Sequence, residues 1–408
     1  MHKLRKSTIA IAMVTAAGLM ALTGCSAAST GGNQTIHALG FGKMPSSILD
    51  AFKKKTGITV KWDFVDTATF PQVLQSRVAA KADIDILNVR GGAEFNKYAK
   101  AKSFAPLTGE KLLSNVTSGG LAPGKFNGTQ YGYSASSYVI GIFYNKDLFK
   151  KAGIEVPTTW TDFTAAMDKL SGAGIAPLVG AEGDGWTNQY YYHAAIAHFA
   201  AENPKFMADL QSGKAKWSQN DLFTKQITRF QGLVSNKYFL NGTQSFKYAD
   251  AVSAFNSGKA AMWAMGDWAL SDVNPQGFEP GAFAVPFSNA APASSLSDNM
   301  FAVASWSKKQ SEAKQFLEFL TEKDQAKTYA VALKKASSIK GVTATISPYQ
   351  ANWDSLLPNA VPFPSNIGPS VNGSGPDLLG DMFAGKASAA EVVAGFQKLQ
   401  DSDNATGY

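Results

Sequence analysis

The sequence predicts an α/β fold in which helices cover largely parallel sheets, divided between two domains. Strand-like and helix-like segments alternate along residues 35–89, and that alternation is typical of parallel sheets. The roughly 375 residues that follow the N-terminal segment exceed what one compact core usually holds, so two domains are expected. No segment after residue 35 is long and apolar enough to span a bilayer.

The first predicted elements alternate regularly. Strand, helix, strand, helix and strand are predicted in that order at residues 35–39, 45–55, 58–64, 70–80 and 84–89. The first helix is expected to end at Thr56-Gly57, because glycine readily adopts the conformation that commonly follows a helix. Arg90-Gly91-Gly92 follows the third strand. This loop therefore lies at the carboxyl end of a strand, where parallel sheets bind their ligands.

A second block of elements occupies the rest of the chain. Strands are predicted at residues 138–144, 175–179, 258–263, 282–286 and 300–304, and helices at 145–153, 157–170, 190–201, 221–234, 249–257, 312–320 and 391–399. Thr161 is the expected N-cap of the helix that ends at Leu170. Residues 368–376 are rich in Gly, Ser, Pro and Asn, and no element is assigned to them.

The N-terminus has the pattern of an export signal. Three cations, Lys3, Arg5 and Lys6, precede an uncharged stretch over residues 9–22. A transmembrane helix needs roughly 20 apolar residues, so this stretch is short for one and suits the apolar region of a signal peptide. The segment Leu22-Thr23-Gly24-Cys25 that follows it resembles the lipobox of bacterial lipoproteins.

The lipobox resemblance implies that residues 1–24 are a signal peptide, removed just before Cys25, and that the Cys25 thiol carries a lipid. Residues 25–34 are small and polar, so they are expected to form a flexible tether. The mature protein is then expected on the extracellular face of the cell membrane, held by its lipid anchor. Because Cys25 is the only cysteine, a disulfide within one chain is excluded.

Charge and histidine content exclude several other classes of protein. The formal net charge of +7 falls to +4 without the signal peptide, and the lysines are scattered among acids. Nucleic-acid binding would require a concentrated basic stripe, so no nucleic-acid partner is expected. The chain has four histidines and no His/Cys group with the spacing of metal ligands. Neither a metal nor a cofactor is therefore expected.

The mature chain resembles the extracellular carbohydrate-binding proteins of ABC importers, known as family 1 solute-binding proteins. The resemblance rests on segments that occur in the order typical of that family. They are Phe52-Lys53-Lys54-Lys55-Thr56-Gly57-Ile58-Thr59-Val60, Ala82-Asp83-Ile84-Asp85-Ile86, Tyr144-Asn145-Lys146-Asp147-Leu148-Phe149, Pro157-Thr158-Thr159-Trp160, Phe255-Asn256-Ser257-Gly258-Lys259, Gly266-Asp267-Trp268 and Glu312-Ala313-Lys314-Gln315-Phe316. Each motif alone is weak, but the ordered set spans most of the mature chain.

This resemblance implies a hinged, two-lobe fold of the periplasmic-binding-protein type (type II), with the ligand cleft between the lobes. The first lobe would comprise residues 35–142 and 293–345, and the second residues 143–292 and 346–408. The resemblance also implies a monomer that captures a sugar or oligosaccharide and delivers it to the permease subunits of an ABC transporter. Catalytic activity is not expected.

A sugar presents apolar C–H faces and a rim of hydroxyl groups, so its site needs aromatic rings together with carboxylate, amide or guanidinium groups. Three predicted loops carry such residues, and the resemblance matches Trp186 and Trp268 to positions where related proteins stack sugars. The candidate ligand-binding residues are Trp186, Trp268, Asp267, Asp184, Asp298 and Asn299, with Arg90, Asp85, Tyr138, Tyr133 and Ser137 as lesser candidates.

Three alternatives remain open from the residues. A glycoside hydrolase would need two carboxylates facing each other across the site, and Asp184 and Asp267 are the available pair. The run Tyr190-Tyr191-Tyr192-His193 is similar to the adjacent tyrosines of ferric-ion carriers, but consecutive helical residues point about 100° apart, which favours a packing role. The same fold could instead hold a polyamine, a glycerol phosphate or a peptide. Acids at Glu182 and Asp184 argue against an anionic ligand.

Overall fold

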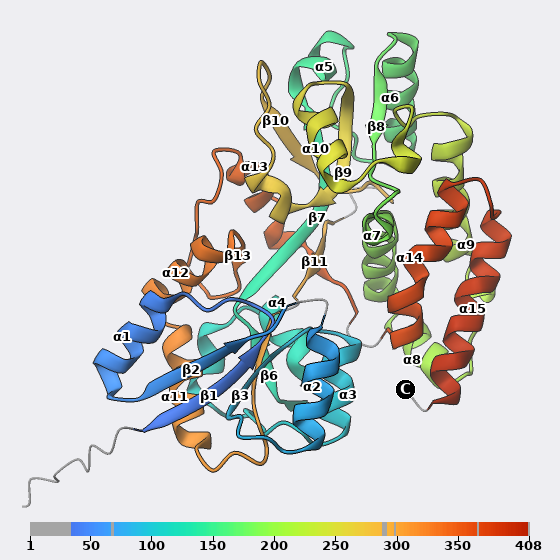
Figure 1. The fold of residues 1–408 in the computed structure, drawn as a ribbon. Coiled ribbons are helices and arrows are strands. Elements are labelled where there is room, and N and C mark those ends of the chain that lie inside the picture. The colour runs from blue at the N-terminus through green and yellow to red at the C-terminus, as the bar shows by residue number, and fades with distance from the viewer. Residues whose placement is uncertain (1–33, 67–68, 288–291, 298, 365–366, 407–408) are drawn as a thin grey trace, which may run out of the picture.

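The computed structural model describes residues 34–66, 69–287, 292–297, 299–364 and 367–406. The predicted signal peptide, Cys25 and Asp298 lie outside these ranges, so what is predicted of them stays a prediction. The described residues form an α/β fold built around two main sheets, as the sequence predicts (Figure 1). No helix within the described ranges has both the length and the apolar character needed to cross a bilayer.

The first sheet has five strands in the order β2-β1-β3-β12-β6. Its strands are β1 (Thr35–Gly40), β2 (Thr59–Phe64), β3 (Ile86–Val89), β6 (Gly132–Ser134) and β12 (Met300–Val303). β1 runs parallel to β2 and β3, whereas β12 is antiparallel to both β3 and β6. The predicted strand–helix alternation at the start of the chain therefore produces the parallel part of this sheet.

Helices cover both faces of the first sheet. They are α1 (Ser46–Thr56), α2 (Phe70–Ala79), α3 (Ala93–Lys100), α4 (Ser118–Leu121), α11 (Gln310–Leu320) and α12 (Lys323–Leu333), with 3-10 turns η1 (Lys111–Asn115) and η2 (Ala122–Gly124) and a small hairpin of β4 (Lys125–Phe126) and β5 (Thr129–Gln130). Ile86 packs into a core with α1, α11 and α12, and its neighbour Leu87 packs with α2 and α3. Successive strand residues thus fill opposite cores.

The second sheet is built on the long strand β7 (Ser136–Asn145), which crosses the middle of the molecule in Figure 1. The strand order is β14-β11-β7-β9-β8, and β10 and β13 also pair with β7. The other strands are β8 (Ala176–Val179), β9 (Ala260–Gly266), β10 (Pro280–Phe283), β11 (Ser294–Leu296), β13 (Ala336–Ser337) and β14 (Val361–Pro362). β10 begins earlier than the predicted strand at residues 282–286.

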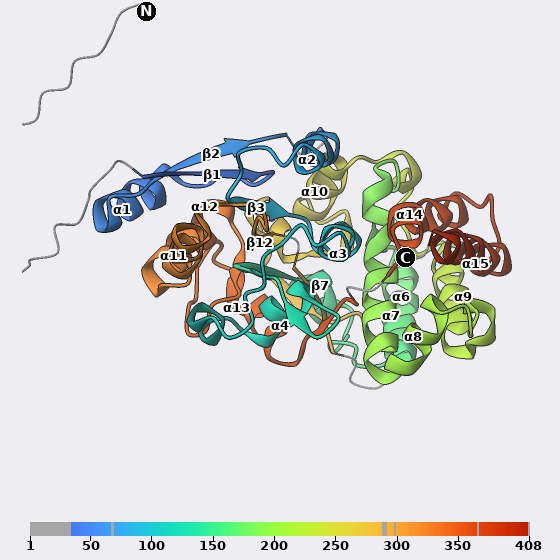
Figure 2. The same cartoon turned by 90° about the horizontal axis from the view of Figure 1, so that it is seen from below.

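The remaining helices belong with the second sheet, and four of them, α7, α9, α14 and α15, stand together at one side of it (Figures 1 and 2). The set is α5 (Lys146–Lys151), α6 (Trp160–Gly172), α7 (Gln189–Glu202), α8 (Pro204–Gln211), α9 (Asp221–Ser235), α10 (Tyr248–Asn256), α13 (Gln350–Asp354), α14 (Pro369–Phe383) and α15 (Ala389–Ala405). Short 3-10 turns are η3 (Gly185–Asn188), η4 (Trp217–Gln219), η5 (Thr243–Ser245), η6 (Asp267–Ser271) and η7 (Leu357–Asn359).

The chain passes between the two sheets several times. Strand β6 belongs to the first sheet and the adjoining β7 to the second, and β11 and β12 are divided in the same way. Residues 138–142 of β7 pair with β9 and β11, and residues 294–296 form β11, so both segments belong to the second sheet. The predicted division assigned both segments to the first lobe, so the observed crossings fall a few residues before residue 138 and after residue 296.

Local sequence signals explain where several helices begin and end. Gly57 has a φ of 77° and its N–H bonds to the carbonyl of Lys53, so α1 ends at the predicted glycine. At α6 the prediction was wrong by two residues, because Thr159, not Thr161, accepts the N–H of Asp162 and caps the helix. Thr159 is extended and precedes the helix, as an N-cap must, whereas Thr161 already lies within it.

Candidate ligand-binding site

A cavity of about 750 Å³ lies between the first half of the molecule, built on the first sheet, and the second half, built on the second sheet. This volume suits a small ligand. The first half contributes residues from the loop before α3 and from the α4–η2 segment, and the second half contributes residues from η3, α7, β11, β14 and the region that enters α14. The lining residues are Arg90, Gly91, Gly92, Ala93, Gly119, Ala122, Pro123, Trp186, His193, residues 295–297 and 362–364, Ile367 and Asn372.

The two halves meet closely at the glycines after β3. A Cβ at Gly91 would lie 2.3 Å from the carbonyl oxygen of Ser297, and Gly92 has a φ of 69°. A larger side chain is disfavoured at Gly91 because there is no space for it, and at Gly92 because of the positive φ. The loop at the carboxyl end of β3 therefore lies against the end of β11, as expected for a ligand-binding edge of a sheet.

Arg90 supplies a guanidinium to the cavity wall. Its carbon Cζ lies 5.6 Å from the centre of the Phe41 ring, and its backbone N–H donates to Oε1 of Glu94 at 2.9 Å. Burial raises the pKa of the Glu94 carboxyl, while that bond and the charge of Arg90 lower it. Among the described residues that line the cavity, none is an Asp or a Glu.

Trp186 is the largest and most exposed of the aromatic side chains among the described lining residues of the cavity. It is 44% exposed, which is unusual for tryptophan, and it lines the cavity from the 3-10 turn η3. Its ring centre is 5.5 Å from that of Tyr248 and 6.0 Å from that of Tyr190. These two rings hold the indole from the protein side and leave part of its surface open. Such a surface suits a ligand with an apolar face.

The contacts of Trp186 continue into a row of aromatic rings. Tyr190 lies 5.4 Å from Trp268, and Trp268 lies 5.2 Å from Tyr138 with their rings nearly perpendicular. We call Tyr248, Trp186, Tyr190, Trp268 and Tyr138 the aromatic row. Tyr138 pairs across the strands with Leu296, a lining residue. Of the five rings, only Trp186 is itself among the described lining residues, so the other four support it from behind.

A lysine from the first half covers the far end of the aromatic row. The Nζ atom of Lys335 lies 4.5 Å from the centre of the Tyr138 ring, a cation–π distance. Burial lowers the pKa of Lys335 to about 8. Lys335 precedes β13, which pairs with the start of β7, so this contact lies where the chain crosses from one sheet to the other.

Asp267 is buried and is not among the described lining residues of the cavity. It is 1% exposed, and burial raises its pKa to about 8, with the nearby amide of Val139 opposing the shift and the charge of Asp354 adding to it. Asp267 and Asp184 both lie outside the cavity lining, so the described lining residues contain no pair of carboxylates facing each other as a glycosidase would require.

Asp184 holds its own loop together. Its carboxylate accepts the N–H of Tyr248 at 2.7 Å and lies 3.2 Å from the Lys247 ammonium. The bond from Tyr248, and then Lys247, lower the pKa of Asp184. Because Tyr248 packs on Trp186, the carboxylate fixes the support of that ring without lining the cavity.

Several other predicted residues have structural partners. Asp85 accepts the N–H of His37 and the hydroxyl of Ser307, at the start of β3 and so at the opposite end from Arg90. Tyr133 is buried and donates to the carbonyl of Leu317. Asn299 and Ser137 are buried, Asn299 next to Gly42 and Ser137 opposite Ala336. None of these four residues is among the described lining residues.

His193 lines the cavity and was considered in the sequence only as part of a metal-binding alternative. It is 5% exposed, its ring packs 4.3 Å from that of Phe363, and burial lowers its pKa to about 3. Neither ring nitrogen has a hydrogen-bond partner among the described residues. Tyr190 and His193 are three residues apart in α7 and so share a face, a helical spacing that could have indicated both.

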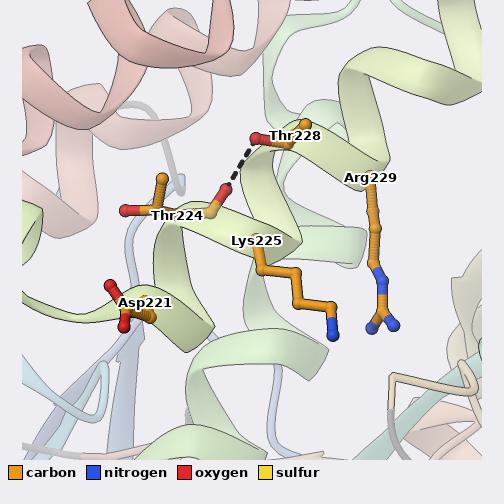
Figure 3. A pocket seen from close by; sticks show the side chains of 5 residues that line it. All are labelled: Asp221, Thr224, Lys225, Thr228 and Arg229. Carbon is orange, nitrogen blue, oxygen red and sulfur yellow. Dashed lines mark hydrogen bonds between the residues drawn. The ribbon is translucent and has the colours of Figure 1, made fainter.

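Two other features are poor candidates for a site. The described residues contain no group of three or more His, Cys, Asp or Glu side chains placed to hold a metal ion. A separate depression on the surface is lined by Asp221, Thr224, Lys225, Thr228 and Arg229, all from the single helix α9 (Figure 3). Arg229 of this depression donates a hydrogen bond to the carbonyl of Phe287 at 2.8 Å and makes a cation–π contact with the Trp160 ring.

The fold and the cavity between its halves define a two-lobe, periplasmic-binding-protein-like α/β protein. A family model described as "Bacterial extracellular solute-binding protein" matches residues 41–327. The chain therefore belongs to the bacterial extracellular solute-binding protein family, a family of binding proteins. This confirms the family that the ordered motifs indicated.

One relative and two solved structures illustrate the similarity. A multiple sugar-binding protein of Streptococcus mutans is 27% identical over 278 residues, which is 66% of each chain, so the match spans just under two thirds of that relative. The apo form of RafE from Streptococcus pneumoniae has a TM-score of 0.78 at 22% identity, covering 91% of this chain and 99% of RafE. RafE in complex with raffinose has a TM-score of 0.69 at 24% identity, covering 91% and 98%. These structures confirm the fold.

Proposed function

We propose that this protein is the substrate-binding component of an ABC importer and that it captures a sugar or an oligosaccharide in the cavity between its lobes. The observation that carries the proposal is the half-exposed Trp186 ring in that cavity, backed by the aromatic row. The relative named as a multiple sugar-binding protein and the RafE structure with raffinose support the same ligand class. The captured sugar is then delivered to the permease subunits.

The chemistry of the lining fits a sugar. An aromatic face accepts the C–H face of a pyranose, and Arg90, His193 and Asn372 offer hydrogen bonds to hydroxyl groups from both halves of the molecule. Ligand groups bridging Arg90 and His193 would favour closure of the lobes, because only a closed form satisfies both contacts.

A second ligand class is favoured by one observation. The sequence-based argument against an anionic ligand relied on Glu182 and Asp184, and neither is a lining residue. Arg90 does line the cavity, and its nearby acid Glu94 is not one of the described lining residues. An anionic sugar or a glycerol phosphate is therefore the second candidate, whereas a polyamine would lack a carboxylate in the described lining.

Thermal unfolding of the purified protein with panels of ligands tests the proposal. We expect raffinose-type or other oligosaccharides to raise the unfolding midpoint, because a ligand at a hundredfold its dissociation constant stabilises the folded state by about 2.7 kcal/mol. Sugar phosphates, polyamines and Fe³⁺ form the other arms. Stabilisation by a phosphate alone would select the second candidate, and stabilisation by iron or a polyamine alone would refute the sugar proposal.

His193→Phe is expected to weaken sugar binding by roughly tenfold while leaving the unfolding midpoint nearly unchanged. The neutral imidazole can donate one hydrogen bond and accept another, as a hydroxyl group requires, and phenylalanine keeps the packing on Phe363 but offers neither. Calorimetric titration measures the affinity. His193→Gln should retain part of it, and equal affinities for the wild type and His193→Phe would show that the imidazole makes no ligand contact.

We also propose that the protein is a monomeric lipoprotein on the extracellular face of the membrane. The uncharged stretch and the Leu22-Thr23-Gly24-Cys25 segment support this, and so does membership of an extracellular binding-protein family. We expect the native protein to fractionate with membranes and Cys25→Ser to be released. Mass spectrometry of the mature N-terminus measures the lipid, and an unmodified Cys25 in the membrane fraction would contradict the anchor.

A further inference from the structure

The two halves of the molecule carry opposite formal charges. Residues 34–135 and 297–345, which form the first half, contain 21 Lys and Arg against 12 Asp and Glu, a formal charge of +9. Residues 136–296 and 346–408, which form the second half, contain 14 Lys and Arg against 19 Asp and Glu, a formal charge of −5. Lysines are scattered among acids along the sequence, but the fold separates the two charges. Such an asymmetry is typical of a protein that binds a charged surface through one side.

Four lysines of the first half come together at one edge of its sheet, because the segment that follows β12 connects them. The hydroxyl of Ser305 donates to the carbonyl of Lys102 at 2.8 Å. The indole N–H of Trp306 donates to the carbonyl of Ala82, the residue after Lys81, also at 2.8 Å. The same segment continues into two further lysines. We call this set the basic edge: Lys81, Lys102, Lys308 and Lys309.

The chain enters the fold at this same edge. The Nζ atom of Lys309 donates to the carbonyl of Thr35, the first residue of β1, at 2.7 Å. The proposed tether, residues 25–34, ends one residue earlier, and a chain of ten residues spans at most about 35 Å when fully extended. A lipid on Cys25 would therefore keep the basic edge within about that distance of the membrane surface.

The basic edge is exposed and lies opposite the ligand cavity. The side chains of Lys81, Lys102 and Lys308 are exposed. β1 and β3 run parallel and begin at this edge, whereas Arg90 follows the other end of β3 and lines the cavity. Asp83 also lies at the edge, where its carboxylate is 3.7 Å from Nε2 of His37. A surface that covered the basic edge would leave the cavity accessible.

We propose that the basic edge docks on an anionic phospholipid surface and orients the tethered protein with its ligand cavity directed away from the membrane. The proposal rests on the proposed lipid anchor for its setting. Anionic lipids attract each nearby Lys or Arg, and salt screens this attraction. The acidic second half is repelled by the same surface, which favours one orientation. Contact through a few lysines is reversible, so it orients the anchored protein and does not replace the anchor.

The backbone allows two of these charges to be removed without disturbing the fold. Lys81 and Lys102 follow α2 and α3 with φ values of 46° and 56°, in the left-handed conformation that glycine adopts most easily. The double variant Lys81→Gly/Lys102→Gly should therefore have an unchanged or higher unfolding midpoint. Lys237→Gly is the matched control, because Lys237 follows α9 of the second half with a φ of 57° and is also exposed.

Sedimentation with phospholipid vesicles tests the proposal on the mature protein carrying Cys25→Ser, which has no attached lipid, and in the absence of sugar. We expect this parent protein to bind vesicles that contain phosphatidylglycerol, but not vesicles of phosphatidylcholine alone, and to dissociate at high salt. The double variant should bind the anionic vesicles about tenfold more weakly. Lys237→Gly should bind them like the parent.

Three results would overturn the proposal. Equal binding to both kinds of vesicle, none to either, or binding that persists at high salt would show that charge does not hold the protein on the surface. Equal losses in the double variant and in Lys237→Gly would assign the attraction to net charge instead of the basic edge. Unchanged vesicle binding by the double variant, together with lost sugar uptake by cells, would assign the edge to a protein partner.

The vesicle assay uses neither the lipid anchor nor a sugar. Its failure is therefore distinguishable from failure of the anchor, which mass spectrometry of the mature N-terminus measures, and from failure of the sugar proposal, which the ligand screen measures.

Discussion

Trp186→Ala should weaken sugar binding by about 10- to 100-fold, or roughly 1.4–2.8 kcal/mol, with little change in stability. The indole is 44% exposed in the cavity, so its removal costs the folded protein little packing and the ligand most of its apolar contact. Calorimetric titration with the sugar found in the ligand screen measures the loss. Trp186→Phe should recover part of the affinity, because a smaller aromatic face remains.

A matched control separates contact with the ligand from a general surface effect. Phe64 is 41% exposed, close to the exposure of Trp186, but it lies at the end of β2 and outside the described cavity lining. Phe64→Ala should therefore bind sugar like the wild type. If Trp186→Ala also binds like the wild type, the sugar does not stack in this cavity and the placement of the site is wrong.

The second tryptophan of the aromatic row should behave differently. Trp268 packs on both Tyr190 and Tyr138, and it is less exposed than Trp186. Trp268→Ala is therefore expected to reduce both affinity and the unfolding midpoint, since its loss leaves a gap between the two tyrosines. The two substitutions together distinguish a ring that mainly contacts the ligand from one that mainly supports the wall.

The fold was largely predictable because apolar periodicity reports on burial, and burial drives the sheet. Residues 58–64 and 84–89 became β2 and β3, and the glycine at position 57 ended α1 as predicted. The exchange of strands between sheets was not visible in local patterns. Whether residues 138–142 pair with β6 or with β9 depends on strands far away in the sequence, and only the family resemblance indicated any crossing.

Of the predicted site residues, Trp186 and Arg90 lie in the described lining of the candidate cavity, whereas the other predicted aromatic residues and the described acids do not. Trp186 and Arg90 lie in the cavity, because loops at the carboxyl ends of strands face it. Asp184 and Asp85 were chosen for the same chemistry, but Lys247, Tyr248 and Ser307 satisfy them. A sequence shows which residues can bind a hydroxyl, but it does not show which are already satisfied by partners distant in the chain.

The helix α14 shows how a distant residue overrides local propensity. Residues 368–376 contain Gly373, Gly375 and Pro376, and no element was assigned there, yet α14 begins at Pro369 and runs through all three. Its first turn is held by Asp403 of α15, whose carboxylate accepts the N–H groups of Ser370 at 2.8 Å and Val371 at 3.1 Å. The carboxylate thus replaces the N-cap side chain that the local sequence lacks.

Asp403→Ala should consequently destabilise the protein by about 3 kcal/mol, measured by denaturant unfolding. Asp403 is 1% exposed, so its removal leaves two N–H groups of α14 without their acceptor, and the negative charge that favours a helix N-terminus is lost. Gly368 approaches the carboxylate so closely that a Cβ there would lie 2.0 Å from Oδ2, which leaves little room for another side chain to take over.

Two controls accompany Asp403→Ala: one removes another acid of α15, and the other makes a milder change at position 403. Asp401→Ala removes an exposed acid of α15 whose side chain bonds, among the described residues, to Gln397 of the same helix, and it should cost less than about 0.5 kcal/mol. Asp403→Asn keeps one oxygen acceptor and should fall between the two. Because Asn372 of the first turn of α14 lines the sugar cavity, Asp403→Ala should also weaken sugar binding. Unchanged stability in Asp403→Ala would mean that α14 is held by its buried apolar face alone.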